Sequence, residues 1–219
     1  MSDFSSGNTF SSRSVHPPPV TGMSFDEANL DAQLKASKLI ASIIINDLAT
    51  ERGAHAETCV TAAARMGGTL LFRTFGLPTV NMPVGAPIFS DIANERGPLL
   101  VEVMKSGLAG LGIVVDESKV SSGPTADHAP LISLVETQQK LDEKIADIAA
   151  SHGLSGEAAA RACALSAATL IYQTRSVLDP AIGFGLAVFG FVEGTKTNPI
   201  PSTRAPVPEP PKTKQWYKF

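Results

Sequence analysis

The sequence is poor in the residues that form disulfides and metal sites. It has two cysteines, Cys59 and Cys163, and four histidines among 219 residues. Two cysteines are too few for a disulfide framework, and neither lies in a CxxC spacing. No HxxxH or ExxH pair offers a helical metal site. We therefore expect reduced thiols in a cytoplasmic protein, with no metal and no other cofactor.

The chain also lacks an excess of basic charge and a long apolar run. Eighteen Lys and Arg against 21 Asp and Glu give a net charge of −3. This charge supplies no field that would attract nucleic acid. The longest apolar stretch, 181–192, is shorter than the roughly 18 residues of a membrane span. The polar N-terminus lacks the apolar stretch of a secretion signal, so neither a span nor a leader is predicted.

Hydrophobic residues make up 43% of the chain, which is enough for a substantial core. They are concentrated in a body that we place at 23–194. The flanking segments, 1–22 and 195–219, are rich in Ser and Pro without any period, so we expect disordered tails at both ends.

Caps, glycines and prolines divide the body into predicted helices and no strands. Ser24 and Glu27 have the spacing of a capping box. Pro98 and Pro180 are each interpreted as first-turn prolines, with Asp179 as the cap before Pro180. The prolines of 78–87 exclude a helix there. The predicted helices are 24–52, 56–75, 98 to between 107 and 112, 130–153, 154–178 and 180–192.

An internal repeat at an offset of 100 residues is the strongest pattern in the sequence. Over 48–94 against 148–194, ten of 47 aligned pairs are identical. The pattern predicts repeat 1 at 24–112, a linker at 113–129 and repeat 2 at 130–194. We expect the two halves to pack as one all-α body around a pseudo-twofold axis. The aligned apolar stripes of the first helices are Leu34, Ala41, Ile45 and Leu48 with Leu134, Leu141, Ile145 and Ile148.

Small side chains mark the second helix of each half. Gly67 and Ala167 lie in stripes dominated by small residues. Because small side chains let two backbones approach closely, these helices are predicted to cross at the centre of the body.

Glu57 and Glu157 recur in both halves, each in the first turn of a predicted helix. Two carboxylates that met near a pseudo-symmetry axis could share a pocket and act in acid–base or metal chemistry. The alternative is that each carboxylate stabilises the start of its own helix. Cys59 has His55 four residues earlier, which is the spacing of an activated thiol, but a buried Cys59 would be a packing residue.

The segment 181–192 is apolar on every side and includes Phe184, Phe189 and Phe191. A helix of this kind must be enclosed by protein. It forms the central helix of the core, an interface with a partner or another copy, or a membrane-associated segment. For binding we select these three phenylalanines.

The segment 195–219 has side chains that sum to a charge of +4, and it ends in an aromatic cluster. Aromatic side chains are the usual anchors of protein interfaces. The cluster consists of Trp216, Tyr217 and Phe219.

The sequence thus predicts a non-catalytic helical scaffold or protein-interaction module that forms homo-oligomers or binds a protein partner. We expect its aromatic and basic C-terminal tail to dock on a neighbour or partner. The alternative is a small-molecule-binding protein or a hydrolase-type enzyme with a cleft between the two halves.

Overall fold

The computed structural model describes residues 27–79, 81–121 and 123–202. In these ranges it contains six α-helices and no strand, so the prediction of an all-α protein is confirmed. No helix there is long and apolar enough to cross a membrane. The elements are α1 (Glu27–Leu48), α2 (Ala56–Arg73), α3 (Asp91–Gly110), a 3-10 turn η1 (Glu117–Lys119), α4 (Leu134–Ser151), α5 (Gly156–Thr174) and α6 (Pro180–Thr195).

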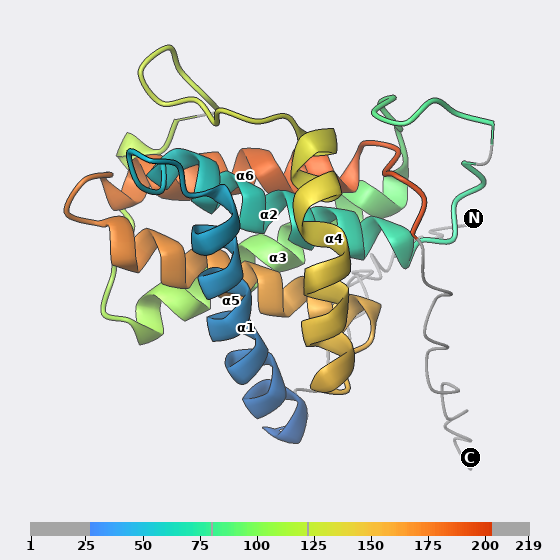
Figure 1. Ribbon diagram of the computed structural model, residues 1–219, viewed down its shortest axis with the longest axis horizontal. Helices are drawn as coiled ribbons and strands as arrows, with labels where there is room; N and C mark the ends of the chain where they lie inside the picture. Colours follow the sequence, from blue (N-terminus) through green and yellow to red (C-terminus); the bar gives the residue numbers. More distant parts are fainter. Residues whose placement is uncertain (1–26, 80, 122, 203–219) are drawn as a thin grey trace, which may run out of the picture.

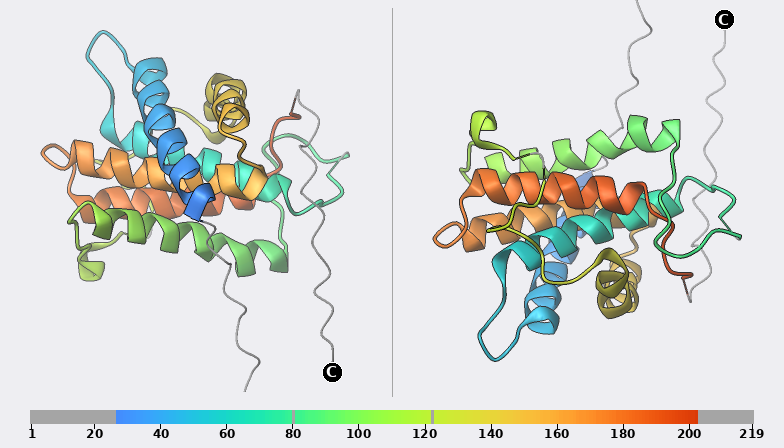
Figure 2. Two further views of the ribbon diagram at one scale, coloured as in Figure 1. Left: turned by 90° about the horizontal axis from the view of Figure 1, so that it is seen from below. Right: turned by 90° about the horizontal axis from the view of Figure 1, so that it is seen from above.

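The helix pair α2 and α5 forms the middle of the molecule (Figure 1). The two helices run in opposite directions, because the start of α5 lies beside the end of α2: a Cβ on Gly156 would lie 2.7 Å from Cγ2 of Thr74. Helices α1 and α4 lie on one side of this pair, and α3 and α6 lie on the other (Figure 2). Along the pair, α6 packs on α2 and α3 packs on α5.

Small residues allow the central helices to pack closely. A Cβ on Gly67 would lie 3.3 Å from the Cβ of Cys163, which places the crossing of α2 and α5 at this glycine. Helix α6 approaches α2 even more closely, since a Cβ on Gly194 would lie 2.4 Å from the carbonyl oxygen of Arg65. The core therefore depends on backbone-to-backbone contact as much as on large side chains.

Local capping explains where α4 and α6 begin. Ser133 and Glu136 form a complete capping box, so α4 begins at Leu134 and not at the predicted Pro130. Asp179 accepts a hydrogen bond from the Ala181 amide, and Pro180 occupies the first turn of α6 as predicted. The predicted cap of the first helix, Ser24, lies outside the described residues.

The prediction for Pro98 is wrong. Helix α3 begins at Asp91 after the extended N-cap residue Ser90, and Pro98 lies inside it. The side chain of Pro98 is exposed, so its ring meets solvent on the outer face of α3. The first helix ends at Leu48, earlier than the predicted residue 52, because a tight turn closed by hydrogen bonds between Thr50 and Gly53 follows it.

The predicted buried face of the first helix is shifted by about one residue. Leu34, which was aligned with Leu134, is 43% exposed, whereas Leu134 is 4% exposed. The buried apolar side chains of α1 are Ala36, Ile40, Ala41 and Ile44, so Ala41 is the one residue of the predicted stripe that is buried. In α4, Leu134, Leu141 and Ile145 of the predicted stripe are buried, and Ile148 is partly buried.

Helix α6 belongs to the core, which is one of the alternatives that its sequence leaves open. Phe184 and Phe191 are buried, and the Phe191 ring lies against Gly67 of α2. These two phenylalanines are therefore not accessible to a partner. Phe189 is partly exposed and packs over Gly123 of the connector between α3 and α4.

The segment after α6 is placed as far as Ser202, so the predicted disordered tail does not begin at 195. The Ile88 amide donates to the Lys196 carbonyl, and Gln138 accepts a hydrogen bond from the Ile200 amide. These contacts hold residues 196–200 against the body.

Candidate functional site

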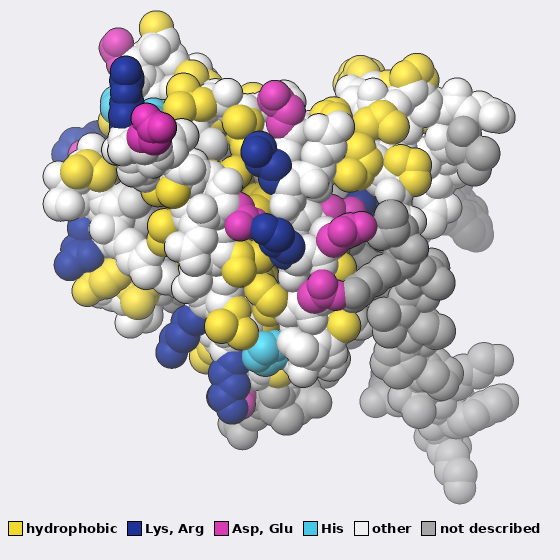
Figure 3. Space-filling view, viewed as in Figure 1, with side chains coloured by type: hydrophobic (Ala, Val, Ile, Leu, Met, Phe, Trp, Pro, Cys, Tyr) yellow, Lys and Arg dark blue, Asp and Glu magenta, His cyan; other side chains and the backbone are white. Residues whose placement is uncertain are grey.

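An exposed apolar surface lies on the connector between α2 and α3. Phe89 is 90% exposed, and Val84 and Met82 are 44% and 38% exposed. We call these three side chains the Phe89 platform. Figure 3 shows apolar side chains gathered on this projecting loop at the upper right of the molecule. Clustered exposed apolar residues are typical of surfaces that bind protein.

Hydrogen bonds hold the backbone of the platform in place. The Gly85 amide donates to the Asn198 carbonyl at 2.9 Å, and the Asn198 amide donates to the Ala86 carbonyl at 2.8 Å. The Asn198 side-chain amide also donates to the Met82 carbonyl. Gly85 has a φ of +82°, a left-handed conformation that glycine adopts without strain. Because the loop is held in this way, Phe89 is presented in a defined position.

A shallow hollow of about 220 Å³ adjoins the platform. It is open to solvent, and Asp91, Asn94 and Lys196 contribute polar groups beside the Phe89 ring. An open hollow of this size cannot enclose a drug-sized ligand.

The sequence did not single out this platform, because 78–87 was interpreted only as a connector. The sequence does contain a sign of exposed apolar residues here, because Met82 and Val84 lie between prolines and a glycine in a segment that cannot form a helix and bury them. Of the other residues predicted to bind a partner, Trp216, Tyr217 and Phe219 lie outside the described residues.

Glu57 lies between two histidines at the start of α2. His128 Nδ1 lies 3.0 Å from Glu57 Oε1, and His55 Nε2 lies 3.3 Å from Glu57 Oε2. Thr58 completes the cluster, since its hydroxyl lies 2.8 Å from His55 Nδ1 and accepts a hydrogen bond from the Leu131 amide. The cluster fastens the connector before α4 to the start of α2.

Burial of Glu57 raises its pKa, but other effects outweigh it. The hydrogen bond from His128, a backbone hydrogen bond and the charges of His55 and His128 together lower the pKa of this carboxyl. Glu57 is therefore ionised near neutral pH, and the carboxylate form is the one that accepts the hydrogen bond from His128.

Thr58, His55 and Glu57 are the residue types of a catalytic triad, but their geometry is that of a helix cap. Thr58 is 4% exposed, and the Leu131 amide occupies its oxygen. His55 Nδ1, which lies next to the Thr58 hydroxyl, also accepts a hydrogen bond from the Thr58 backbone amide, so the imidazole ring caps α2. In the described part of the chain, no group of three His, Cys, Asp or Glu side chains is arranged to hold a metal ion.

The second recurring carboxylate, Glu157, forms ion pairs with Arg96 of α3 and Arg161 of its own helix. It does not meet Glu57. Since α2 and α5 are antiparallel, the two carboxylates lie at opposite ends of the pair, separated by roughly 24 Å of helix. Each instead ties a helix start to a neighbouring segment.

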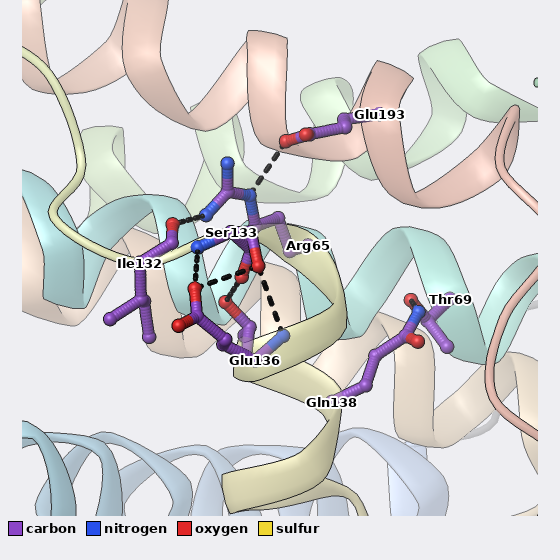
Figure 4. A network of polar contacts seen from close by, with 8 residues as sticks. Arg65, Thr69, Ile132, Ser133, Glu136, Gln138 and Glu193 are labelled. Atoms are coloured by element: carbon purple, nitrogen blue, oxygen red, sulfur yellow. Dashed lines mark hydrogen bonds and ion pairs between the residues drawn. The ribbon is translucent and has the colours of Figure 1, made fainter. Parts of the chain in front are cut away.

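A polar seam joins α2 to α4 and α6 (Figure 4). Buried Arg65 donates to Glu193 at 2.6 Å and to the Ile132 carbonyl at 2.5 Å. One turn along α2, Thr69 accepts from the Gln138 side chain at 2.9 Å. Each buried polar group in these contacts has a partner, so the seam fixes the position of α4 without leaving a buried charge unpaired.

A further turn along, Arg73 completes the seam with two hydrogen bonds to Asp142, at 2.6 and 2.8 Å. It also donates to the Ile200 carbonyl at 3.2 Å. A bidentate Arg–carboxylate pair of this kind adds geometric specificity. The seam therefore also holds the segment that leads to the C-terminus.

Neither cysteine is activated. Burial raises the pKa of Cys59 to about 11, and burial, with a smaller contribution from Asp142, raises the pKa of Cys163 further. His55 is engaged by Glu57 and Thr58. Both thiols are therefore packing residues of the core.

Comparison of the chain with protein-family models, with curated proteins and with solved structures found no match.

Proposed function

We propose that this protein is a non-catalytic helical interaction module that self-associates or binds a protein partner through the Phe89 platform, with its C-terminal segment docking on a neighbour. The exposure of Phe89 on a loop held by hydrogen bonds is the observation that carries the proposal. Among the described residues, Phe89 is the only aromatic side chain that is exposed rather than buried or half-buried.

The proposal includes the internal repeat, with each half a three-helix unit. Reciprocal packing supports it: α1 packs on α5 of the other half, and α4 packs on α2. In the same way α6 packs on α2, and α3 packs on α5. An exchange of the two halves about an axis through the α2–α5 crossing would interchange these contacts.

The two halves differ most in the connector before their third helix. Residues 74–90 join α2 to α3, whereas only residues 175–179 join α5 to α6. The long connector carries the whole platform. In a duplicated scaffold, one copy can acquire such an insertion while both copies keep the packing that maintains the fold.

Replacement of Phe89 by Ser tests this function. Burial of a phenylalanine ring contributes about 2 kcal/mol, so its loss from an interface should weaken association at least tenfold. Size-exclusion chromatography with light scattering over a concentration series would measure the effect. Phe89 is exposed, so the variant should keep its stability.

Val177→Ser is the matched control, because Val177 is 78% exposed on the loop between α5 and α6, away from the platform. A purified wild-type chain that self-associates is expected to lose mass with Phe89→Ser and keep it with Val177→Ser. If both variants behave like the wild type in self-association and in partner capture, the proposed function is wrong.

A further inference from the structure

The route of the C-terminal segment leads past the platform. Residues 196–198 pair with the platform loop, and Lys196 lines the same hollow as Phe89. The chain is then held at Ile200 by Gln138 and Arg73. Residues 203–219, which we call the terminal segment, therefore start close to the platform of their own chain.

We infer that the Phe89 platform is occupied by the terminal segment of a second copy of this chain, with Trp216 as the anchor, in a reciprocal exchange that closes a dimer. The inference rests on the proposed function. The terminal segment carries the single tryptophan of the sequence with Tyr217 and Phe219. Large aromatic side chains of this kind are the usual anchors in apolar interfaces.

Proline content favours a second copy over the same chain as the acceptor. Residues 205–211 include Pro206, Pro208, Pro210 and Pro211. In the extended conformation that proline favours, these seven positions span about 22 Å. Trp216 follows five residues later, a reach of at most about 18 Å. Return of Trp216 to the platform of its own chain would therefore require both stretches to be almost fully extended in opposite directions, which costs conformational entropy that docking on a second copy avoids.

Charge supports the same pairing. The side chains of 203–219 sum to +3. Asp91 and Lys196 line the hollow next to Phe89, and Glu95 is exposed one turn further along α3, so two acids face one base at this edge. Lys214 and Lys218, which flank the aromatic residues of the terminal segment, would meet these acids when Trp216 covers Phe89.

Fluorescence of Trp216 can test the inference on full-length chains, because no other tryptophan contributes. The donor is Phe89→Ser, which keeps the terminal segment but lacks the platform ring. The acceptor carries Trp216→Ala, Tyr217→Ala and Phe219→Ala, so it keeps the platform and emits no tryptophan signal. Titration of acceptor into donor then reports only docking between two chains.

We expect the Trp216 emission of the donor to shift to the blue and to saturate as acceptor is added. The shift should remain when the acceptor also carries Val177→Ser. When the acceptor also carries Phe89→Ser, the same shift should require at least tenfold more acceptor. No shift, or an equal shift with the Phe89→Ser acceptor, would overturn the inference. So would a wild-type emission that is already blue-shifted and independent of concentration, because it would show docking within one chain. Self-association that depends on Phe89 without any shift would leave the proposed function intact.

Discussion

The contact between α2 and α6 gives the sharpest test of how this core is held together. Replacement of Gly194 by Ala would place a Cβ 2.4 Å from the Arg65 carbonyl oxygen and 2.9 Å from the Gly68 Cα. Ordinary contacts of this kind begin near 3.4 Å, so the two helices must separate by about 1 Å. The obstructing atoms belong to the backbone, so no change of side-chain rotamer can relieve the clash.

The cost follows from the contacts that this separation weakens. A gap of about 1 Å removes up to half of the attraction of each atom pair, and each pair is worth about 0.15 kcal/mol. If about 50 atom pairs are affected, the loss is roughly 3 kcal/mol, at the upper end for overpacked cores. The better helix propensity of Ala returns about 1 kcal/mol. We therefore expect a net destabilisation of about 2 kcal/mol or more.

Urea unfolding followed by far-ultraviolet circular dichroism would measure this free energy. Gly110→Ala is the control, because it is an exposed helical position with nothing within 4 Å of the new Cβ, and its stability should be unchanged or higher. The double variant Gly68→Ala/Gly194→Ala should cost less than the sum of its parts, since one separation relieves both clashes. If Gly194→Ala unfolds like Gly110→Ala, the close-packing argument fails.

Two further predictions concern Glu57 and the two cysteines. Because folding lowers the pKa of Glu57 from 4.5, its contribution to stability is present above that value and is lost as the pH falls through the lower folded pKa. The difference in free energy of unfolding between wild type and Glu57→Gln should therefore become smaller as the pH falls. A difference that stays constant from pH 6 to pH 3 would contradict this prediction. Cys59 and Cys163 should resist a thiol reagent in native protein and react fully in denaturant; rapid native labelling of Cys59 would refute its assignment to the core.

Much of the secondary structure could be predicted from the sequence, because it depends on interactions within one or two turns. The first-turn proline after Asp179 set the start of α6. The small residues around Gly67 predicted the close crossing of the central helices, which the structure contains. The start of α3 was missed because the pairing of the platform loop with 196–198 lies outside any local pattern.

The candidate site was harder to predict. Phe89 and Phe191 both lie among apolar residues in the sequence, yet Phe89 is exposed and Phe191 is buried. Only the packing of α6 on α2 accounts for this difference in burial. Likewise, Glu57 and Glu157 occupy equal positions in their helices. The antiparallel arrangement of α2 and α5 is what keeps them apart.

The sequence by itself determined the helical class and the starts of α2 and α6, since caps, prolines and the periodicity of apolar residues act over distances of a few residues. Only the tertiary structure decided which face of α1 is buried, which partners the two carboxylates bind and which aromatic ring is left in solvent. These outcomes depend on contacts between segments 61 to 129 residues apart, whose free energies are realised only when the helices pack together.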